Sequence, residues 1–173
     1  MNSEATVITA TIVDWIDLFS RKEFRYIVLD SLRYCQTHKG LKIHAWCLMS
    51  NHLRMIISSD LGNLSDIMRD FKKHTAKRII AEMDVINESR REWLKEAFVA
   101  AGRDLKRIKN FKVWKDGNHP KCIGTIYFLE QKLDYIHNNP VENELVDEPE
   151  YYLYSSARDY HGRQGLLKVE LLY

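Results

Sequence analysis

Residues 41–58 read LKIHAWCLMSNHLRMIIS and hold the pattern on which the fold prediction depends. Two apolar runs, Leu41–Met49 and His52–Ser58, are separated only by Ser50 and Asn51. Apolar runs of this length joined by a short polar link are typical of a β-hairpin. We therefore predict two neighbouring antiparallel strands in this part of the chain.

The segments around this hairpin predict further strands and helices. Strands are expected over 5–13 and 111–114, and helices over 20–38, 64–83, 88–101 and 123–138. The last helix should end at Asn138-Asn139-Pro140, because proline interrupts helical hydrogen bonding. This order predicts an α+β fold with a mostly antiparallel sheet and helices mainly on one face. With no internal repeat or flexible linker, residues 1–173 are expected to form one domain.

Composition is ordinary for a globular domain and narrows the protein class. Hydrophobic residues make up 45% of the 173-residue chain and charged residues 29%. The three cysteines are far apart in the sequence, which favours free thiols in a reducing compartment over a disulfide framework. No apolar run approaches the roughly 20 residues that span a bilayer, and no secretory signal is evident. These features predict a cytoplasmic protein without a membrane partner.

Positive charge is concentrated locally although the formal net charge is only +2. One basic group lies between positions 103 and 121, and a second lies on the helix expected over 64–83. The members are Arg103, Lys106, Arg107, Lys109, Lys112, Lys115 and Lys121 in the first group, and Arg69, Lys72, Lys73, Lys77 and Arg78 in the second. Such groups can form a phosphate-binding face, but on charge alone solvated helix surfaces are the favoured interpretation.

His52 and Arg54 are predicted to lie on the same face of the second hairpin strand. Side chains alternate along a strand, so Leu53 points to the opposite face. If the apolar set faces the core, an imidazole and a guanidinium stand side by side on the other face. Taken alone, this pattern does not separate a functional pair from structural side chains.

Tyr135 is the candidate nucleophile in the last predicted helix. It lies beside an apolar stripe that includes Leu133 and Ile136, and Asn139 follows it by one helical turn. A tyrosine hydroxyl can attack phosphorus and form a phosphotyrosine link when charge is withdrawn from the phosphate. An amphipathic tyrosine at the margin of a core is the structural alternative.

These motifs together resemble the one-tyrosine branch of the HUH nuclease superfamily. The segment 45–57, AWCLMSNHLRMII, resembles the strand that carries the motif His, hydrophobic residue, His in that superfamily. The later segment 135–141, YIHNNPV, resembles the tyrosine helix of the REP-associated tyrosine transposases. The resemblance extends over about residues 5 to 162 with the motifs in consistent order. It implies a ferredoxin-like antiparallel sheet with the motif strand near its centre.

The resemblance also implies an activity and a set of site residues. Members of this family cut and rejoin single-stranded or hairpin DNA with a tyrosine nucleophile and a divalent ion, Mg²⁺ or Mn²⁺. On that basis His52 corresponds to the first metal ligand, Asn139 to the helix ligand and Tyr135 to the nucleophile. Related transposases act as monomers or as dimers that exchange the tyrosine helix, so a homodimer is one of two expected states.

Arg54 departs from the family pattern, because it occupies the position of the second histidine. A guanidinium offers only donors and cannot ligate a cation. Three interpretations follow: a decayed transposase that retains DNA binding, an arginine that contacts phosphate in place of the metal, or a local variant of an active protein. We favour DNA binding with weak or absent cleavage, and a non-catalytic nucleic-acid-binding module is the alternative.

Additional DNA contacts are expected around the turn that precedes the tyrosine helix. Aromatic side chains among basic residues suit stacking on unpaired bases. The candidates are His119, Trp114, Lys112, Lys115 and Arg107, together with Lys72 and Lys73 on the preceding long helix. The same residues are also compatible with core packing or solvated surface, and a protein-interaction domain without a nucleic-acid role remains a third hypothesis.

Overall fold

A computed structural model describes residues 4–103 and 111–173. The elements are β1 (Thr6–Thr11), η1 (Val13–Trp15), η2 (Leu18–Ser20), α1 (Lys22–His38), β2 (Leu41–Leu48), β3 (His52–Ser59), α2 (Leu64–Val85), α3 (Arg91–Gly102), β4 (Lys121–Cys122), α4 (Ile126–Glu142), η3 (Pro149–Tyr151) and α5 (Ala157–Tyr160). The predicted combination of an antiparallel sheet with helices is confirmed. Among the described helices, none has the length and apolar character needed to cross a membrane.

The four strands form one antiparallel sheet in the order β2-β3-β1-β4. The hairpin predicted from residues 41–58 is present as β2 and β3, with an irregularity in register between Ile43 and Ala45. β3 is a central strand, flanked by β2 and β1. In the β1–β3 register, His52 lies opposite Thr11 and Arg54 lies opposite Thr9.

The fourth strand lies later in the chain than predicted. Residues 111–114 make only a single bridge, between Trp114 and Ile12, and β4 is the short segment Lys121–Cys122. Between these points the chain touches β1 through isolated bonds: Lys115 N donates to Thr11 O (2.8 Å), and Thr9 N donates to Asn118 O (2.8 Å). The prediction of a strand at 111–114 is therefore wrong, because these bonds do not form a continuous ladder.

α4 continues past the proline that was expected to end it. Pro140 lies inside the helix, which reaches Glu142. The last turn is held by Asn143, whose backbone N–H (3.1 Å) and side-chain amide (2.8 Å) both donate to Asn139 O. A proline near the end of a helix removes only one intrahelical donor, and the bonds from Asn143 satisfy the Asn139 carbonyl in the last turn.

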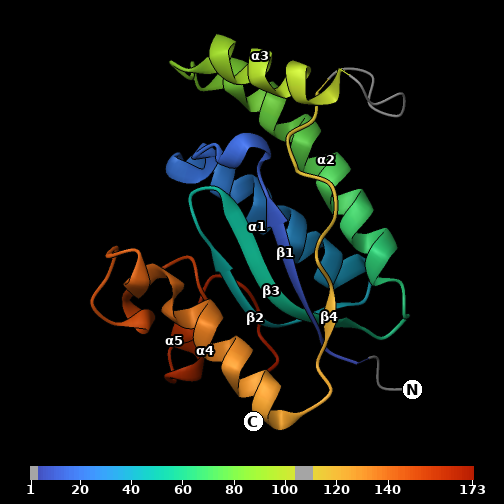
Figure 1. Ribbon diagram of the computed structural model, residues 1–173, viewed down its shortest axis with the longest axis vertical. Helices are drawn as coiled ribbons and strands as arrows, with labels where there is room; N and C mark the ends of the chain where they lie inside the picture. The colour runs from blue at the N-terminus through green and yellow to red at the C-terminus, as the bar shows by residue number, and fades with distance from the viewer. Residues whose placement is uncertain (1–3, 104–110) are drawn as a thin grey trace.

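One face of the sheet is closed by α1 and α2, which lie behind it in Figure 1. The helices bury Phe24, Leu32 and Phe71 against strand residues such as Leu53 and Met55, all at most 1% exposed. α3 packs on the same side through Leu94 and Phe98, and its start at Arg91 is later than the predicted 88. This apolar layer is the main core of the molecule.

The opposite face is covered in part by α4, which crosses in front of the sheet in Figure 1. Leu133 and Ile136 of α4 pack against Ala45, Cys47 and Ile56. This second apolar cluster is small, so α4 shields one end of the face and leaves the other end to polar side chains.

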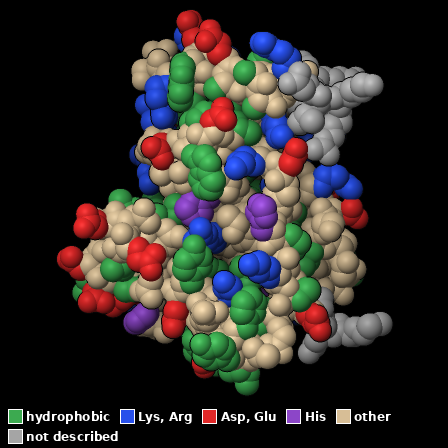
Figure 2. Space-filling model, in the orientation of Figure 1, with side chains coloured by type: hydrophobic (Ala, Val, Ile, Leu, Met, Phe, Trp, Pro, Cys, Tyr) green, Lys and Arg blue, Asp and Glu red, His purple; other side chains and the backbone are tan. Residues whose placement is uncertain are grey.

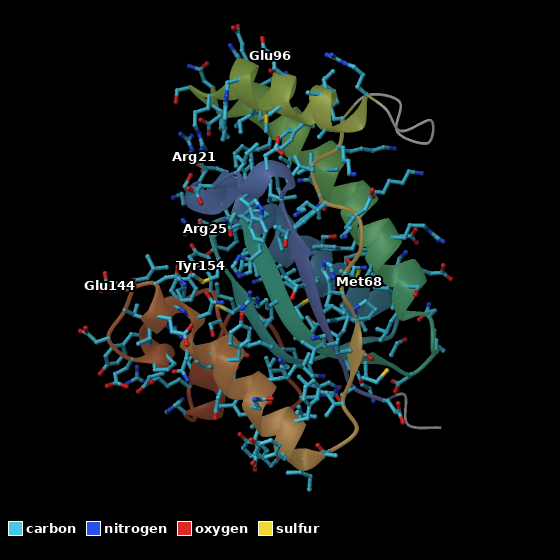
Figure 3. All side chains as sticks on the ribbon, viewed as in Figure 1. Arg21, Arg25, Met68, Glu96, Glu144 and Tyr154 are labelled. Carbon is cyan, nitrogen blue, oxygen red and sulfur yellow. The ribbon has the colours of Figure 1, made fainter. Side chains whose placement is uncertain are left out.

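The C-terminal segment runs along the outer edge of β2. Leu48 N donates to Tyr154 O (2.8 Å), Ser156 N donates to Trp46 O (2.9 Å), and Glu170 N donates to Ile43 O (2.9 Å). Tyr154 also packs against α1, where the guanidinium of Arg25 lies 4.2 Å from the centre of its ring (Figure 3). The end of the chain thereby covers the free edge of the sheet.

Candidate functional site

The polar end of the α4-facing sheet surface holds the candidate site. His52 and Arg54 of β3 are half-buried there, next to Thr11 and Thr9 of β1. The alternation predicted from the sequence is observed, because the intervening Leu53 is fully buried in the core on the other face. Figure 2 shows histidine, lysine and arginine side chains gathered over the middle of this surface.

Asn51 fixes the protonation pattern of His52. The Asn51 side-chain N–H donates to Trp15 O (3.4 Å), so the amide oxygen is the atom that faces His52 Nδ1, at 2.7 Å. Nδ1 must then carry the proton and donate, which leaves a lone pair on Nε2. Nε2 is buried and has no hydrogen-bond partner among the described residues. The imidazole therefore presents an acceptor to the site.

His52 is neutral at physiological pH. Burial, followed by the positive charge of Arg54, lowers the pKa of His52 to about 4. The neighbouring guanidinium thus reinforces the effect of desolvation. A neutral imidazole beside a permanent cation is the charge state to consider in any function of this site.

Arg54 and Tyr135 bring the strand and α4 together. The guanidinium carbon lies 4.4 Å from the centre of the Tyr135 ring, a cation–π contact. Tyr135 is 43% exposed, so its phenol combines this contact with access from solvent. Lys132 places a second cation 5.6 Å from the same ring centre. The phenol and His52 thus both border on Arg54, on the same side of the sheet.

Two donor atoms of Arg54 are held without a protein acceptor. Nε and Nη1 are buried and have no hydrogen-bond partner within the described part of the chain. Buried donors without acceptors cost free energy, and such groups recur at binding sites for ligands that supply the acceptor. An anion with paired oxygens, such as a phosphate, matches the geometry of a guanidinium.

α4 is anchored by a buried histidine two residues after Tyr135. His137 Nε2 is 2.8 Å from Ser156 Oγ, and Ser156 Oγ also accepts a bond from Trp46 N (2.9 Å). Burial, with a smaller effect of His161, lowers the pKa of His137 to about 4. This network connects the tyrosine helix to β2 through the C-terminal segment. The buried, neutral side chains of His137 and Ser156 therefore hold in place the part of α4 that carries Tyr135.

Asn139 is placed one helical turn after Tyr135, as predicted, and is 5% exposed. Its side-chain oxygen accepts a hydrogen bond from the Asn143 amide (3.0 Å). The amide is consequently engaged within α4. Asn143 had no role in the sequence prediction, although its spacing of four from Asn139 is the signal that pairs the two.

The side chains at this place do not fit a divalent metal ion. Arg54 offers only donors, the Asn139 oxygen already accepts one bond, and His52 contributes a single imidazole lone pair. Mg²⁺ and Mn²⁺ favour several oxygen ligands, and a fixed guanidinium repels a cation. Over the described residues, no group of three or more His, Cys, Asp or Glu side chains is placed to hold a metal.

Two of the predicted DNA contacts make structural contacts within the protein. Trp114 is 4% exposed, packs between aromatic rings of the main core and donates its indole N–H to Thr75 Oγ1 (2.9 Å). It therefore offers no free ring face to a base. Lys72 Nζ donates to the carbonyls of Lys115 and Gly117 (3.0 Å each), and burial lowers its pKa to about 8. Lys72 braces the loop before β4.

The other predicted contacts have varied surroundings. Lys115, His119 and Lys73 are exposed, and His119 has a left-handed backbone with φ of 47°. Lys112 is paired with Asp116 at 2.8 Å, an interaction that leaves its charge partly neutralised. Arg107 lies outside the described residues. Lys115 and His119 belong to the loop region that contacts β1.

Sequence reasoning missed the loop that precedes α1. Trp15 is 60% exposed and lies beside Asn51, the hydrogen-bond partner of His52. A tryptophan just after a strand reads as a core residue, and nothing local in the sequence marks its exposure. Lys132 was also missed, although its spacing of three from Tyr135 places both on one helix face.

One family model and two solved structures are similar to this chain. The family model described as "Transposase IS200 like" matches residues 17–104, which is 88 of the 173 residues. A solved structure of a REP-associated tyrosine transposase bound to a REP hairpin has a TM-score of 0.62 and 15% identity, covering 100% of this chain and 89% of that chain. A protein from Deinococcus radiodurans assigned to the transposases has a TM-score of 0.47 and 15% identity, covering 78% and 90%. A search of curated proteins found no match.

Proposed function

This chain belongs to the IS200-like transposase family, and from that premise we propose that it binds folded single-stranded DNA, with metal-dependent strand cleavage weak or absent. The bound strand would cross the polar end of the sheet, where His52, Arg54 and Tyr135 meet. The solved transposase with the same fold is itself bound to a REP hairpin. The lysine and arginine side chains gathered over the middle of this face (Figure 2) carry positive charge, which supports a polyanionic ligand.

The contact that best supports this function is the one between Arg54 and Tyr135, at 4.4 Å. It places a candidate nucleophile beside a cation whose Nε and Nη1 donors have no acceptor among the described residues. A backbone phosphate supplies paired oxygens that these donors can bind. A phosphate held in this way would lie next to the exposed phenol.

Each site residue then has a distinct role in the proposal. Arg54 binds the phosphate and partly neutralises it, and Tyr135 is the nucleophile inherited from the family. Attack would form a bond between the phenolic oxygen and phosphorus, break the bond to the leaving sugar oxygen, and transfer a proton from the phenol to that oxygen through solvent. His52 accepts a hydrogen bond at the edge of the site, and Asn139 and His137 position α4.

Cleavage is expected to be weak because a single guanidinium replaces a stronger electrostatic centre. The resemblance to the one-tyrosine transposases implies a divalent metal ion, yet the side chains here do not fit one. Binding needs only charge and shape, so it survives this replacement. Attack on the phosphorus also requires that charge be withdrawn from the phosphate, so the rate of cleavage is lowered more than the affinity for DNA.

A labelled hairpin oligonucleotide with an unpaired extension tests this function. The protein, Arg54→His and Tyr135→Phe are compared for binding and for a covalent protein–DNA adduct, with Mn²⁺, with Mg²⁺ and with chelator. We expect salt-dependent binding by all three, little adduct with the unmodified protein, and more adduct with Arg54→His when metal is added. The double variant Arg54→His with Tyr135→Phe is the control and should form none.

The alternative function is a non-catalytic nucleic-acid-binding module on the same fold. The arginine at the ligand position favours it, since the site then has no route to metal-dependent chemistry. Binding without adduct in every variant, Arg54→His included, would support this module and reject the nuclease. Affinity that is absent or indifferent to salt would reject both, because neutralised phosphates make log Kd depend on log salt with a slope of about 0.7 per contact for single strands.

A further inference from the structure

Trp15 has an unusual position for a large apolar side chain. It is 60% exposed at the end of η1, directly after β1. Its φ is 55°, and the preceding Asp14 has a φ of 54°. Non-glycine residues rarely adopt this left-handed conformation, and for a bulky residue it costs free energy. The surrounding structure therefore imposes the exposed orientation of the ring.

The loop around Trp15 is rigidly held. Val13, Ile16 and Leu18 are all buried in the main core. Trp15 N donates to Ile12 O (3.2 Å), while Trp15 O accepts from the Asn51 side chain (3.4 Å). The backbone is thus tied to the core on both sides of a side chain that projects outwards. Such a ring is preorganised, so a ligand that stacks on it pays little to order it.

A cation is fixed beside the ring. Lys115 Nζ lies 4.6 Å from the centre of the Trp15 ring. The backbone of Lys115 is held by its bond to Thr11 O (2.8 Å) and by Lys72 Nζ, which donates to its carbonyl (3.0 Å). An aromatic face next to a lysine is the combination that binds unpaired nucleotides, with the base on the ring and the phosphate near the ammonium.

Trp15 and Lys115 lie next to the candidate site. Asn51 contacts Trp15 O with its amide nitrogen and His52 Nδ1 with its amide oxygen. Across the sheet, Thr11 is the partner of His52 and accepts the bond from Lys115 N. A strand whose phosphate sits at Arg54 therefore has Trp15 within reach of a neighbouring nucleotide.

We propose that Trp15 and Lys115 form a stacking site for an unpaired base of the bound DNA, next to the phosphate held by Arg54. This site rests on the proposed function and adds to it a place that selects single-stranded over paired nucleotides. Stacking accepts any base, so the site contributes affinity and register rather than sequence readout.

Trp93 provides a matched control within the same chain. It is 54% exposed on α3, in ordinary helical conformation. Among the contacts of the described residues, no cation lies over its ring. It therefore has similar exposure to Trp15 without the fixed loop, the lysine or the neighbouring site.

Fluorescence anisotropy with three labelled hairpins tests the stacking site. The hairpins carry an unpaired extension, the same extension with abasic nucleotides, or no extension. Trp15→Ala should weaken binding to the first hairpin by about 5- to 150-fold, the equivalent of ~1–3 kcal/mol for one stacked base. Trp15→Phe should retain most of the affinity, Lys115→Gln should lower it with a smaller salt dependence, and Trp93→Ala should match the unmodified protein.

The hairpins separate this proposal from the function on which it rests. If Trp15→Ala binds the extended hairpin as tightly as the unmodified protein does, the stacking site is rejected while DNA binding stands. Equal losses on the extended and abasic hairpins also reject it, because no base is then involved. Failure of the unmodified protein to bind any hairpin would reject the proposed function and the stacking site together.

Discussion

The two faces of the central sheet are built from alternate residues of the same strands, yet they differ in kind. On the face under α1 and α2, Ile8, Ala10, Leu53 and Met55 are at most 3% exposed and enclosed by apolar helix residues. On the face under α4, the apolar cluster includes Ile56 of β3, and the next two side chains of β3 on this face are the polar Arg54 and His52. Burial of apolar area explains the composition of the face under α1 and α2. The polar side chains on the face under α4 need another explanation.

The difference shows where stability and function separate in this molecule. Apolar side chains in a closed layer gain free energy in proportion to the area removed from water. Arg54 instead keeps buried donors that have no acceptor in the part of the chain that the structure describes, which works against stability. This cost in stability supports the proposed role of Arg54 in binding a ligand next to the exposed phenol of Tyr135.

The largest expected effect comes from truncating adjacent residues on β3. Leu53→Ala removes a side chain that is fully buried in the main core and should lower the free energy of unfolding by about 2–5 kcal/mol. Arg54→Ala removes a cation–π contact and two unpaired donors, so it should change this free energy by less than about 1 kcal/mol. Urea denaturation of both variants measures the difference.

Similar losses in the two variants would contradict the contrast between faces. That result would mean that Arg54 stabilises the fold rather than serving a ligand. Leu53→Met, which nearly conserves volume, is the control for a non-specific disturbance of β3 and should cost less than about 1.5 kcal/mol.

A smaller effect is expected from pH at the anchor of α4. The unfolded chain protonates His137 as pH falls through about 6.5, whereas the folded chain holds its pKa at about 4. Between these values the unfolded state binds more protons, so stability falls as pH falls from 6.5 towards 4 and is unaffected by this group above 6.5. From pH 7 to pH 5 the loss should be about 2 kcal/mol.

His137→Gln tests this assignment, because glutamine can still bond Ser156 but does not titrate. Unfolding free energies of both proteins at pH 7 and pH 5 should show a weaker pH dependence in the variant. Parallel pH profiles would show that His137 is not held neutral in the folded protein.

The smallest effect concerns the brace between the two faces. Lys72 extends from α2, on the closed side, to carbonyls of the loop that borders the open side. Lys72→Met should destabilise the protein by about 1 kcal/mol, the net value of typical hydrogen bonds. The exposed neighbour Lys73, changed to Met, should stay within about 0.5 kcal/mol of the unmodified protein.

DNA affinity distinguishes these lysines in a second way. If Lys73 contacts phosphate, its variant loses affinity and the salt slope falls by about 1. Lys72→Met should weaken binding only through the loop, with most of the salt slope retained. If Lys72→Met instead loses affinity together with a fall of about 1 in the salt slope, Lys72 leaves the carbonyls of Lys115 and Gly117 when DNA binds.

Strong local patterns made the hairpin and the face of His52 and Arg54 predictable. Apolar runs on both sides of Ser50-Asn51 have one plausible pairing, and strand alternation then assigns each side chain. The position of Tyr135 beside the apolar stripe of α4 followed from helical periodicity in the same way. These are interactions between residues close in sequence.

The misses arose where distant contacts override local signals. For Trp114, which stands among lysines, the sequence left base stacking and core packing both open, and Phe19 and Phe71 enclose it from other elements. Pro140 did not end its helix, and the bonds from Asn143 to Asn139 close the turn around it. The exposure of Trp15 depends on a backbone conformation that its neighbours impose, which no periodicity reveals.

The C-terminal segment also has a consequence for self-association. Unpaired edge strands are the usual route by which sheets of separate molecules join and aggregate. Here β2 already donates and accepts bonds with residues 154, 156 and 170, and the other edge is the two-residue β4. Two molecules could join their sheets through β2 only after this C-terminal segment had detached from the strand. The segment therefore protects β2 against edge-to-edge aggregation.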